Sequence, residues 1–207
     1  LFLIIKKLFK PCLLVGLFLW LLISDFNHTL LITFTPSLMA IAQSLKMEMA
    51  YEAENTRKML ATLPEDQFDW KPGEKGMPLG MLAGHLAEIP GWAKETMLQA
   101  ELDFATTDYT PYEPKTRQEI LDTFNQRMEV FNEIMDKVKD EEFFVDWTMR
   151  TGEMVHFTMP RIQVMRSMLL NHFIHHRGQL STYLRCLNVP ATSLYGPTAE
   201  DKEAMGA

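Results

Sequence analysis

Cysteine is nearly absent from this sequence, and no hydrophobic run is long. The 207 residues include two cysteines, Cys12 in an apolar leader and Cys186 in a polar-flanked segment. Cysteines in such different surroundings indicate neither a disulfide framework nor a cysteine-rich metal site. The sequence also lacks a set of strand-like segments large enough for a sheet fold. A chain of this length with 47% hydrophobic residues can bury the core of one ordinary domain.

Basic residues are the second shortage. The chain has 20 lysines and arginines against 27 acidic residues, and three of the lysines lie in the first 38 residues beside a single acid, Asp25. The remainder therefore has 17 basic and 26 acidic groups, which is a net charge of −9. Such a body lacks the basic face that nucleic acids require, so we expect no nucleic-acid partner.

Residues 1–38 form an apolar leader whose longest run, Cys12 to Ile23, has 12 residues. That length suits the core of a signal peptide but is short for a membrane span. The small-residue pattern at residues 40–42 lies farther from this core than a cleavage site should. Three interpretations stay open: an over-extended start with a cytoplasmic protein, a signal peptide with an exported one, or an N-terminal membrane anchor. Function is expected in residues 39–207, the predicted domain.

Beyond residue 39, hydrophobic residues recur at helical spacing in four segments. We expect these helices at about 41–63, 79–92, 116–138 and 160–187. Stretches that contain glycine or proline separate the first three segments. At 1.5 Å per residue, such helices form a bundle about 35 to 40 Å long. The sequence therefore predicts an all-α fold, a four-helix bundle.

Three local signals refine this prediction. Pro90 should kink the second helix or expose it locally. Glu119 completes a capping box with Thr116 at the start of the third helix. Residues 147–158 alternate in a strand-like way about Thr151-Gly152, which indicates a small hairpin between the third and fourth helices.

Two histidines of the fourth helix are spaced to share one face. His172 and His176 are four residues apart, so their side chains lie one above the other on an α-helix. A projection at 100° per residue places both inside the apolar arc and His175 at its rim or on the surface. The same projection of the second helix places His85 on the inward side.

Three inward imidazoles from two helices predict a metal site. Each buried imidazole must satisfy its polar nitrogens, and protonation would place a charge in the core. Coordination takes one nitrogen of each ring and favours the neutral form. Three ligands leave positions open, as at a catalytic ion, and zinc, nickel, iron or copper would fit. The alternative is a purely structural dimer with a core of hydrogen-bonded histidines.

Three separated segments, in this order, are similar to the DinB (damage-inducible) family of bacterial proteins. They read LPEDQFDWKPGEKGMPLGMLAGHLAEIPGW, NHFIHHRGQL and LNVPATSLYGPTAED, and the resemblance covers about residues 39–201. It implies an up-down-down-up bundle, frequently a homodimer, with a divalent metal held by three histidines. Matched by motif, these ligands are His85, His172 and His176.

The resemblance also implies an activity. The better understood relatives are thiol S-transferases and thiol-dependent isomerases that use a low-molecular-weight thiol such as bacillithiol or mycothiol. A bound metal lowers the pKa of a thiol and presents a thiolate for attack on an electrophile. We therefore expect a metal-dependent thiol S-transferase that acts on a small molecule. The alternatives are a metal-dependent hydrolase and a non-enzymatic bundle that binds a metal or a small ligand.

Two glutamates are candidates for proton transfer near such an ion. Glu52 interrupts the apolar stripe of the first helix, and we take it as the candidate catalytic residue. Glu88 lies one turn from His85, although a solvated helix charge is its more common role. Arg177 and Gln179 could orient an anionic co-substrate or support the histidines, but such residues more often lie on a helix surface or at a dimer contact. Three tryptophans could line the mouth of a pocket, namely Trp70, Trp92 and Trp147.

Overall fold

The computed structural model describes residues 40–206 except residue 109. The leader, with the three interpretations of it, lies outside the described residues. Within the described part of the chain, no helix is both long and apolar enough to cross a membrane.

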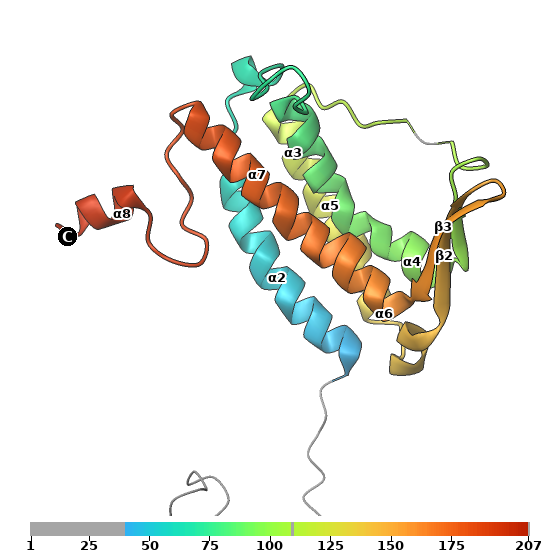
Figure 1. Ribbon diagram of the computed structural model, residues 1–207. Coiled ribbons are helices and arrows are strands. Elements are labelled where there is room, and N and C mark those ends of the chain that lie inside the picture. The colour runs from blue at the N-terminus through green and yellow to red at the C-terminus, as the bar shows by residue number, and fades with distance from the viewer. Residues whose placement is uncertain (1–39, 109, 207) are drawn as a thin grey trace, which may run out of the picture. The chain divides into compact units, whose positions relative to one another are not determined.

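Four long helical segments form a bundle with a small sheet at one end (Figure 1). The predicted all-α bundle is therefore confirmed, and the sheet includes the predicted hairpin. The bounds are α2 (Ile41–Leu60); α3 (Leu79–Glu88), a 3₁₀ turn (Ile89–Trp92) and α4 (Ala93–Leu98); α5 (Arg117–Met135); and α6 (Arg161–Val164), a π-helical segment (Met165–Asn171) and α7 (His172–Cys186). Shorter 3₁₀ turns lie at Glu65–Gln67 and Asp140–Phe144, and a last helix is α8 (Ala199–Ala204).

The long segments run up, down, down and up, as predicted (Figure 1). Both α2 and α3 pack against α5 and α7. Because α3 and α5 run in the same direction, a tight turn cannot join them, and the chain between α4 and α5 returns along the bundle (Figure 1). This connection leaves α3 directly beside α7.

Local chemistry explains how two of the helices begin and bend. The Thr116 side chain accepts a hydrogen bond from the Glu119 backbone N–H (3.1 Å), and the Glu119 carboxylate accepts one from the Lys115 N–H (2.7 Å). The Thr116 half of the predicted capping box is thus present, whereas the Glu119 carboxylate bonds the backbone N–H of Lys115 and not that of the N-cap residue itself. Pro90 lies in the 3₁₀ turn that separates α3 from α4, which is the predicted interruption. Of the two predicted alternatives, a kink or a local exposure, the structure shows the interruption, and Pro90 is buried.

The sheet has three strands in the order β1-β2-β3. β2 (Asp146–Thr151) and β3 (Met154–Pro160) form the predicted antiparallel hairpin, with Gly152 at φ +56° in its turn. β1 (Glu101–Asp103) pairs in parallel with β2 and was not predicted. Three residues are too few to show a strand period, so pairing with the hairpin defines this strand.

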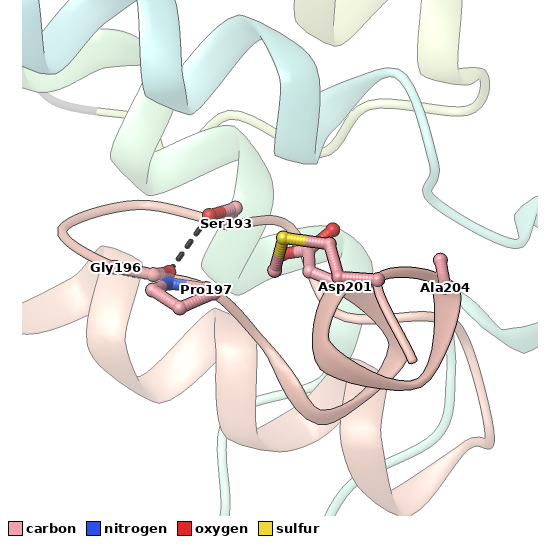
Figure 2. Close-up of a pocket in the computed structure, with 6 residues that line it drawn as sticks. Ser193, Gly196, Pro197, Asp201 and Ala204 are labelled. Carbon is pink, nitrogen blue, oxygen red and sulfur yellow. Dashed lines mark hydrogen bonds between the residues drawn. The ribbon is translucent and has the colours of Figure 1, made fainter. Parts of the chain in front are cut away.

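The segment after α7 leaves the bundle and carries α8 (Figure 1). Asn188, just beyond α7, has a φ of +57°, a left-handed conformation that ends many helices. Farther on, Ser193, Gly196 and Pro197 line a shallow pocket together with residues of α8, and the Ser193 hydroxyl donates to the Gly196 carbonyl at 2.7 Å (Figure 2). None of the three predicted metal ligands lines this pocket.

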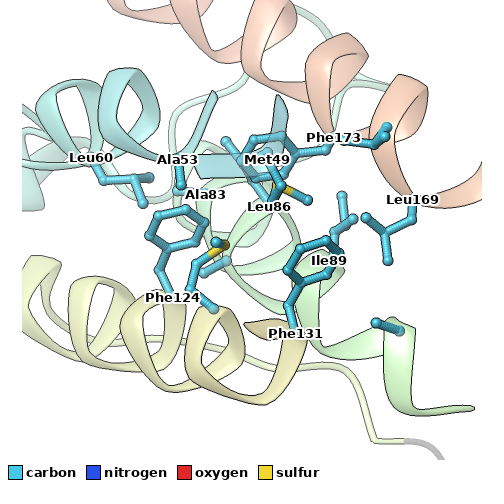
Figure 3. Packing of buried hydrophobic residues seen from close by; sticks show 14 of the residues in the cluster. Met49, Ala53, Leu60, Ala83, Leu86, Ile89, Phe124, Phe131, Leu169 and Phe173 are labelled. Carbon is cyan, nitrogen blue, oxygen red and sulfur yellow. The ribbon is translucent and has the colours of Figure 1, made fainter. Parts of the chain in front are cut away.

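The core lies where the four long segments face one another (Figure 3). Phe124 of α5 and Phe173 of α7 stack with ring centroids 5.9 Å apart and an interplanar angle of 8°. Leu86 of α3 and Met49 of α2 are fully buried beside them. Burial of each such side chain stabilises the fold by about 1.5 to 3 kcal/mol. Because α3 and α7 both contribute to this core, their relative position is well defined.

The buried face of α7 differs from the predicted arc. Its buried residues are Phe173, Arg177, Leu180 and Leu184, whereas His172 and His176 are half-buried at the edge of that face. The surface position expected for Arg177 was wrong, because only 1% of this residue is exposed.

A buried ion pair explains both Arg177 and the glutamate that interrupts the stripe of α2. Arg177 Nη2 lies 2.5 Å from Glu52 Oε2, and Arg177 Nη1 donates to the Glu52 backbone carbonyl at 3.0 Å. The Tyr195 hydroxyl contacts both Glu52 carboxylate oxygens, at 2.9 and 3.0 Å. These contacts link α2, α7 and the C-terminal segment.

Replacing Arg177 by Met should lower the free energy of unfolding by about 3 kcal/mol or more, because the Glu52 carboxylate then stays buried without its partner. Urea denaturation followed by circular dichroism measures this loss. The control is Arg185→Met, which breaks an exposed pair with Glu200 and should cost less than about 1 kcal/mol. Equal losses in the two variants would contradict the importance of the buried pair.

Candidate metal centre

The three predicted ligands come together where α3 packs against α7. His85 Nε2 lies 3.4 Å from His172 Nε2, which in turn lies 2.6 Å from His176 Nε2. One ligand atom from each ring lies within 4.8 Å of the others. Nitrogens that bind one zinc ion tetrahedrally at about 2.05 Å are separated by about 3.3 Å. A single divalent cation can therefore contact all three rings after small adjustments.

Hydrogen bonds orient the two rings of α7. His172 Nδ1 donates to the Met168 carbonyl (3.3 Å), and His176 Nδ1 donates to Oε1 of Gln179 (2.7 Å). Because each Nδ1 carries the proton, each Nε2 presents a lone pair. Two such lone pairs 2.6 Å apart repel each other unless a cation lies between them. The donor set therefore fits a divalent metal, and Gln179 provides one of the supporting bonds considered from the sequence.

A π-helical segment, Met165–Asn171, directly precedes His172. The wider turn bonds each N–H to a carbonyl five residues back, which rotates the following helix relative to a regular α-helix. Met168, whose carbonyl holds the His172 ring, belongs to this segment. The local widening thus helps to set the direction in which both α7 histidines point.

Burial lowers the pKa of all three imidazoles. For His85 the pKa falls to about 4, with burial as the main cause and repulsion by His176 and His172 adding to it. For His172 and His176 burial also lowers the pKa, while the bonds to Met168 and Gln179 oppose the shift. The neutral form, which binds metals, therefore persists to lower pH than in a free imidazole.

A cavity of about 660 Å³ opens onto His85 and His172. Its size suits a small organic molecule. Trp92 lines the cavity beside the ligands, and its ring centroid is 5.4 Å from that of His85 and 5.3 Å from that of His172. Trp147 lines the same cavity. Two of the three tryptophans considered are thus placed there, whereas Trp70 packs against Tyr183.

Of the two glutamates considered, Glu88 lines the cavity. Burial raises the pKa of its carboxyl, and the nearby Arg127 opposes that rise. Glu52 is not among the cavity-lining residues, and both of its carboxylate oxygens are engaged by Tyr195 and Arg177. Its catalytic role stays a prediction.

The other two described histidines do not belong to the three-histidine group, although the ring centroid of His175 lies 5.1 Å from that of His176. His175 is exposed on α7, as the helical projection predicted. His156 is exposed on β3 and hydrogen-bonds the Thr151 hydroxyl at 2.9 Å. Sequence reasoning missed the cavity residue Arg127, which comes from α5. Its position three residues after Phe124 on an amphipathic helix gave no signal that separates it from a surface arginine.

An up-down-down-up bundle with histidines converging from its second and fourth long segments defines a class of helical protein with a candidate divalent-metal site. The family model of the DinB family matches residues 39–206. The chain belongs to the DinB family.

Individual relatives agree with this assignment. The chain is 24% identical over 162 residues to a Bacillus subtilis protein described as "Uncharacterized protein YrdA", covering 75% of this chain and 89% of the relative. A solved DinB-like protein from Bacillus cereus is 25% identical with a TM-score of 0.57, covering 73% of this chain and 95% of the other. A DinB-like protein from Bacillus subtilis, YjoA, is 14% identical with a TM-score of 0.56, covering 73% and 96%, and supports the fold alone.

Replacing His172 by Ala should abolish tight binding of a divalent metal, because its Nε2 atom lies within 3.4 Å of the Nε2 atoms of both other rings. Equilibrium titration with Zn²⁺ and elemental analysis of untagged protein measure affinity and stoichiometry. We expect about one ion per wild-type chain and an affinity at least about 100-fold weaker in the variant. His156→Ala, which removes an exposed histidine, should bind like the wild type. A His172→Ala variant that keeps the wild-type affinity would exclude this site.

Metal affinity should change little between pH 7.5 and pH 6. Three imidazoles with the ordinary pKa of 6.5 would lose about 50-fold in affinity over that range, because protons compete for the nitrogens. Since burial lowers all three pKa values, protons displace the metal only at lower pH, and the loss to pH 6 should stay below about tenfold. Competition with a chromophoric chelator at each pH checks this. A 50-fold loss would mean that the rings titrate like free imidazoles.

Proposed function

We propose that this protein is a metal-dependent thiol S-transferase whose divalent ion is held by His85, His172 and His176. One observation carries the proposal: the Nε2 atoms of these rings converge beside a cavity of about 660 Å³ that His85 and His172 line. A divalent ion bound there would lower the pKa of a thiol and favour the thiolate at neutral pH. The thiolate is the nucleophilic form of a thiol.

The reaction joins a low-molecular-weight thiol to an electrophilic carbon. A bond forms between the thiol sulfur and that carbon, while the bond from the carbon to its leaving group breaks and the leaving group takes the electron pair. The thiol proton must be accepted before or during this step. Glu88 lies on the wall of the cavity that His85 enters, and its raised pKa allows it to bind a proton nearer to neutral pH than an exposed glutamate would.

The cavity walls support this chemistry in a second way. Trp92 and Trp147 line the cavity together with aliphatic residues such as Leu102 and Val130. A largely apolar wall strengthens electrostatic interactions near the histidines and binds the apolar part of a substrate. Homodimer formation, expected from the family resemblance, remains part of the proposal.

Metal-loaded protein should consume a thiol in the presence of a suitable electrophile. The assay follows the loss of free cysteine, or of bacillithiol, with a panel of aryl halides and epoxides, using a thiol-specific chromophore. Glu88→Gln should lower kcat by about 100-fold while metal binding stays intact, because proton transfer by a placed carboxylate contributes about that much. Glu133→Gln, which removes an exposed carboxylate, should retain full activity.

The wild-type rate should fall as pH falls through the raised pKa of Glu88, because the protonated acid cannot accept the thiol proton. Metal binding without thiol loss across the whole panel would contradict the transferase and favour a metal-binding module. Turnover of an ester or amide that needs no thiol would instead identify a hydrolase.

A further inference from the structure

Arg127 places a positive charge in the wall of the metal-site cavity. It comes from α5, whereas the ligands come from α3 and α7. The side chain is half-buried. Among the described residues, it forms neither a salt bridge within 4.0 Å nor a side-chain hydrogen bond. The guanidinium therefore retains its capacity to bind an anion.

A glycine makes room for this arginine. The Arg127 side chain lies over Gly91 in the 3₁₀ turn between α3 and α4, and a Cβ atom at Gly91 would lie 2.6 Å from Arg127 Cδ and 3.3 Å from Nε. Any side chain at this position would push the arginine away. The next residue, Trp92, contacts the rings of His85 and His172. Arg127 therefore packs against Gly91, and the residue that follows Gly91 in the sequence, Trp92, contacts two of the three candidate metal ligands.

The surrounding charges limit the kind of anion that fits. Three acidic residues, Glu88, Glu95 and Asp108, line the same cavity, and Lys94 is exposed at it. A dianion such as a phosphate monoester would be repelled by these carboxylates more strongly than a monoanion. The planar guanidinium fork also matches both oxygens of one carboxylate. The cavity therefore favours a single carboxylate over a phosphate.

We propose that Arg127 binds the carboxylate of a substrate or thiol co-substrate whose remaining part is apolar and packs against Trp92 and Trp147. This inference rests on the proposed function, since it assumes that the reacting molecule enters this cavity. Arg127 is then a specificity-determining residue, which selects a carboxylate-bearing molecule and orients it relative to the histidines. The exposed Lys94 can attract the same anion from solution.

The test uses binding rather than turnover, so its outcome is independent of whether the transferase reaction occurs. Phenylacetate and its neutral analogue phenylacetamide are titrated into the full chain by calorimetry. The wild type should bind the carboxylate about 10- to 100-fold more tightly than the amide, as expected for a charge-assisted bidentate contact. Arg127→Gln should lose this preference and keep the amide affinity, whereas Arg185→Gln, the same charge change at an exposed site, should keep both.

The metal itself could also bind a carboxylate, so the titrations are repeated on zinc-free protein. A preference that persists without zinc and disappears in Arg127→Gln supports the proposal. A preference for the carboxylate over the amide that disappears without zinc and persists in Arg127→Gln overturns the proposal. Tighter binding of benzylphosphonate than of phenylacetate would also overturn it. Gly91→Ala provides an independent variant, because its Cβ displaces Arg127 without changing the charge. Gly91→Ala should reduce the preference for the carboxylate several-fold, and an unchanged preference would contradict the packing of Arg127 over Gly91 as the basis of carboxylate binding.

Discussion

The packing of α7 against α3 is the contact on which the candidate metal centre depends. His85 belongs to one of these helices and His172 and His176 belong to the other, so the distances between their nitrogens depend on the interface. The interface is also part of the main core, where Leu86 and Phe173 are fully buried. Because close-packed cores deform little, the side chains that stabilise the bundle also preorganise the ligands.

Two polar networks on neighbouring faces of α7 fix its rotation about its own axis. On the buried face, Arg177 is paired with Glu52 of α2. At the edge of that face, Gln179 holds the ring of His176. A rotation of α7 that moved the imidazoles would also separate Arg177 from Glu52 and leave a buried charge without its partner, which is energetically costly. Glu52 therefore supports the site through the position of a helix, whatever further role it has.

The sequence predicted the helical segments, the Thr116 cap of α5, the hairpin and the inward faces of the three histidines, because each depends on spacing within one segment. The convergence of the three imidazoles also depends on how α3 packs against α7, and it was expected from those inward faces together with the resemblance to the DinB family. Prediction from the sequence failed where the outcome depends on partners far along the chain. Arg177 was expected at the surface because its partner Glu52 lies 125 residues away. Arg127 was missed because its position facing the cavity depends on how α5 packs beside Gly91. The three-residue β1 was missed because only its pairing with β2 makes it a strand.

The sequence separation of 87 positions from His85 to His172 determines when the ligand set can exist. During synthesis the chain emerges from its amino end, so α3 is made long before α7 leaves the ribosome, and by itself it offers one of the three imidazoles. A single imidazole binds a divalent ion only weakly. A divalent ion that needs all three rings would therefore bind only after α7 is complete and has docked, and its binding would stabilise the complete bundle relative to partly assembled chains.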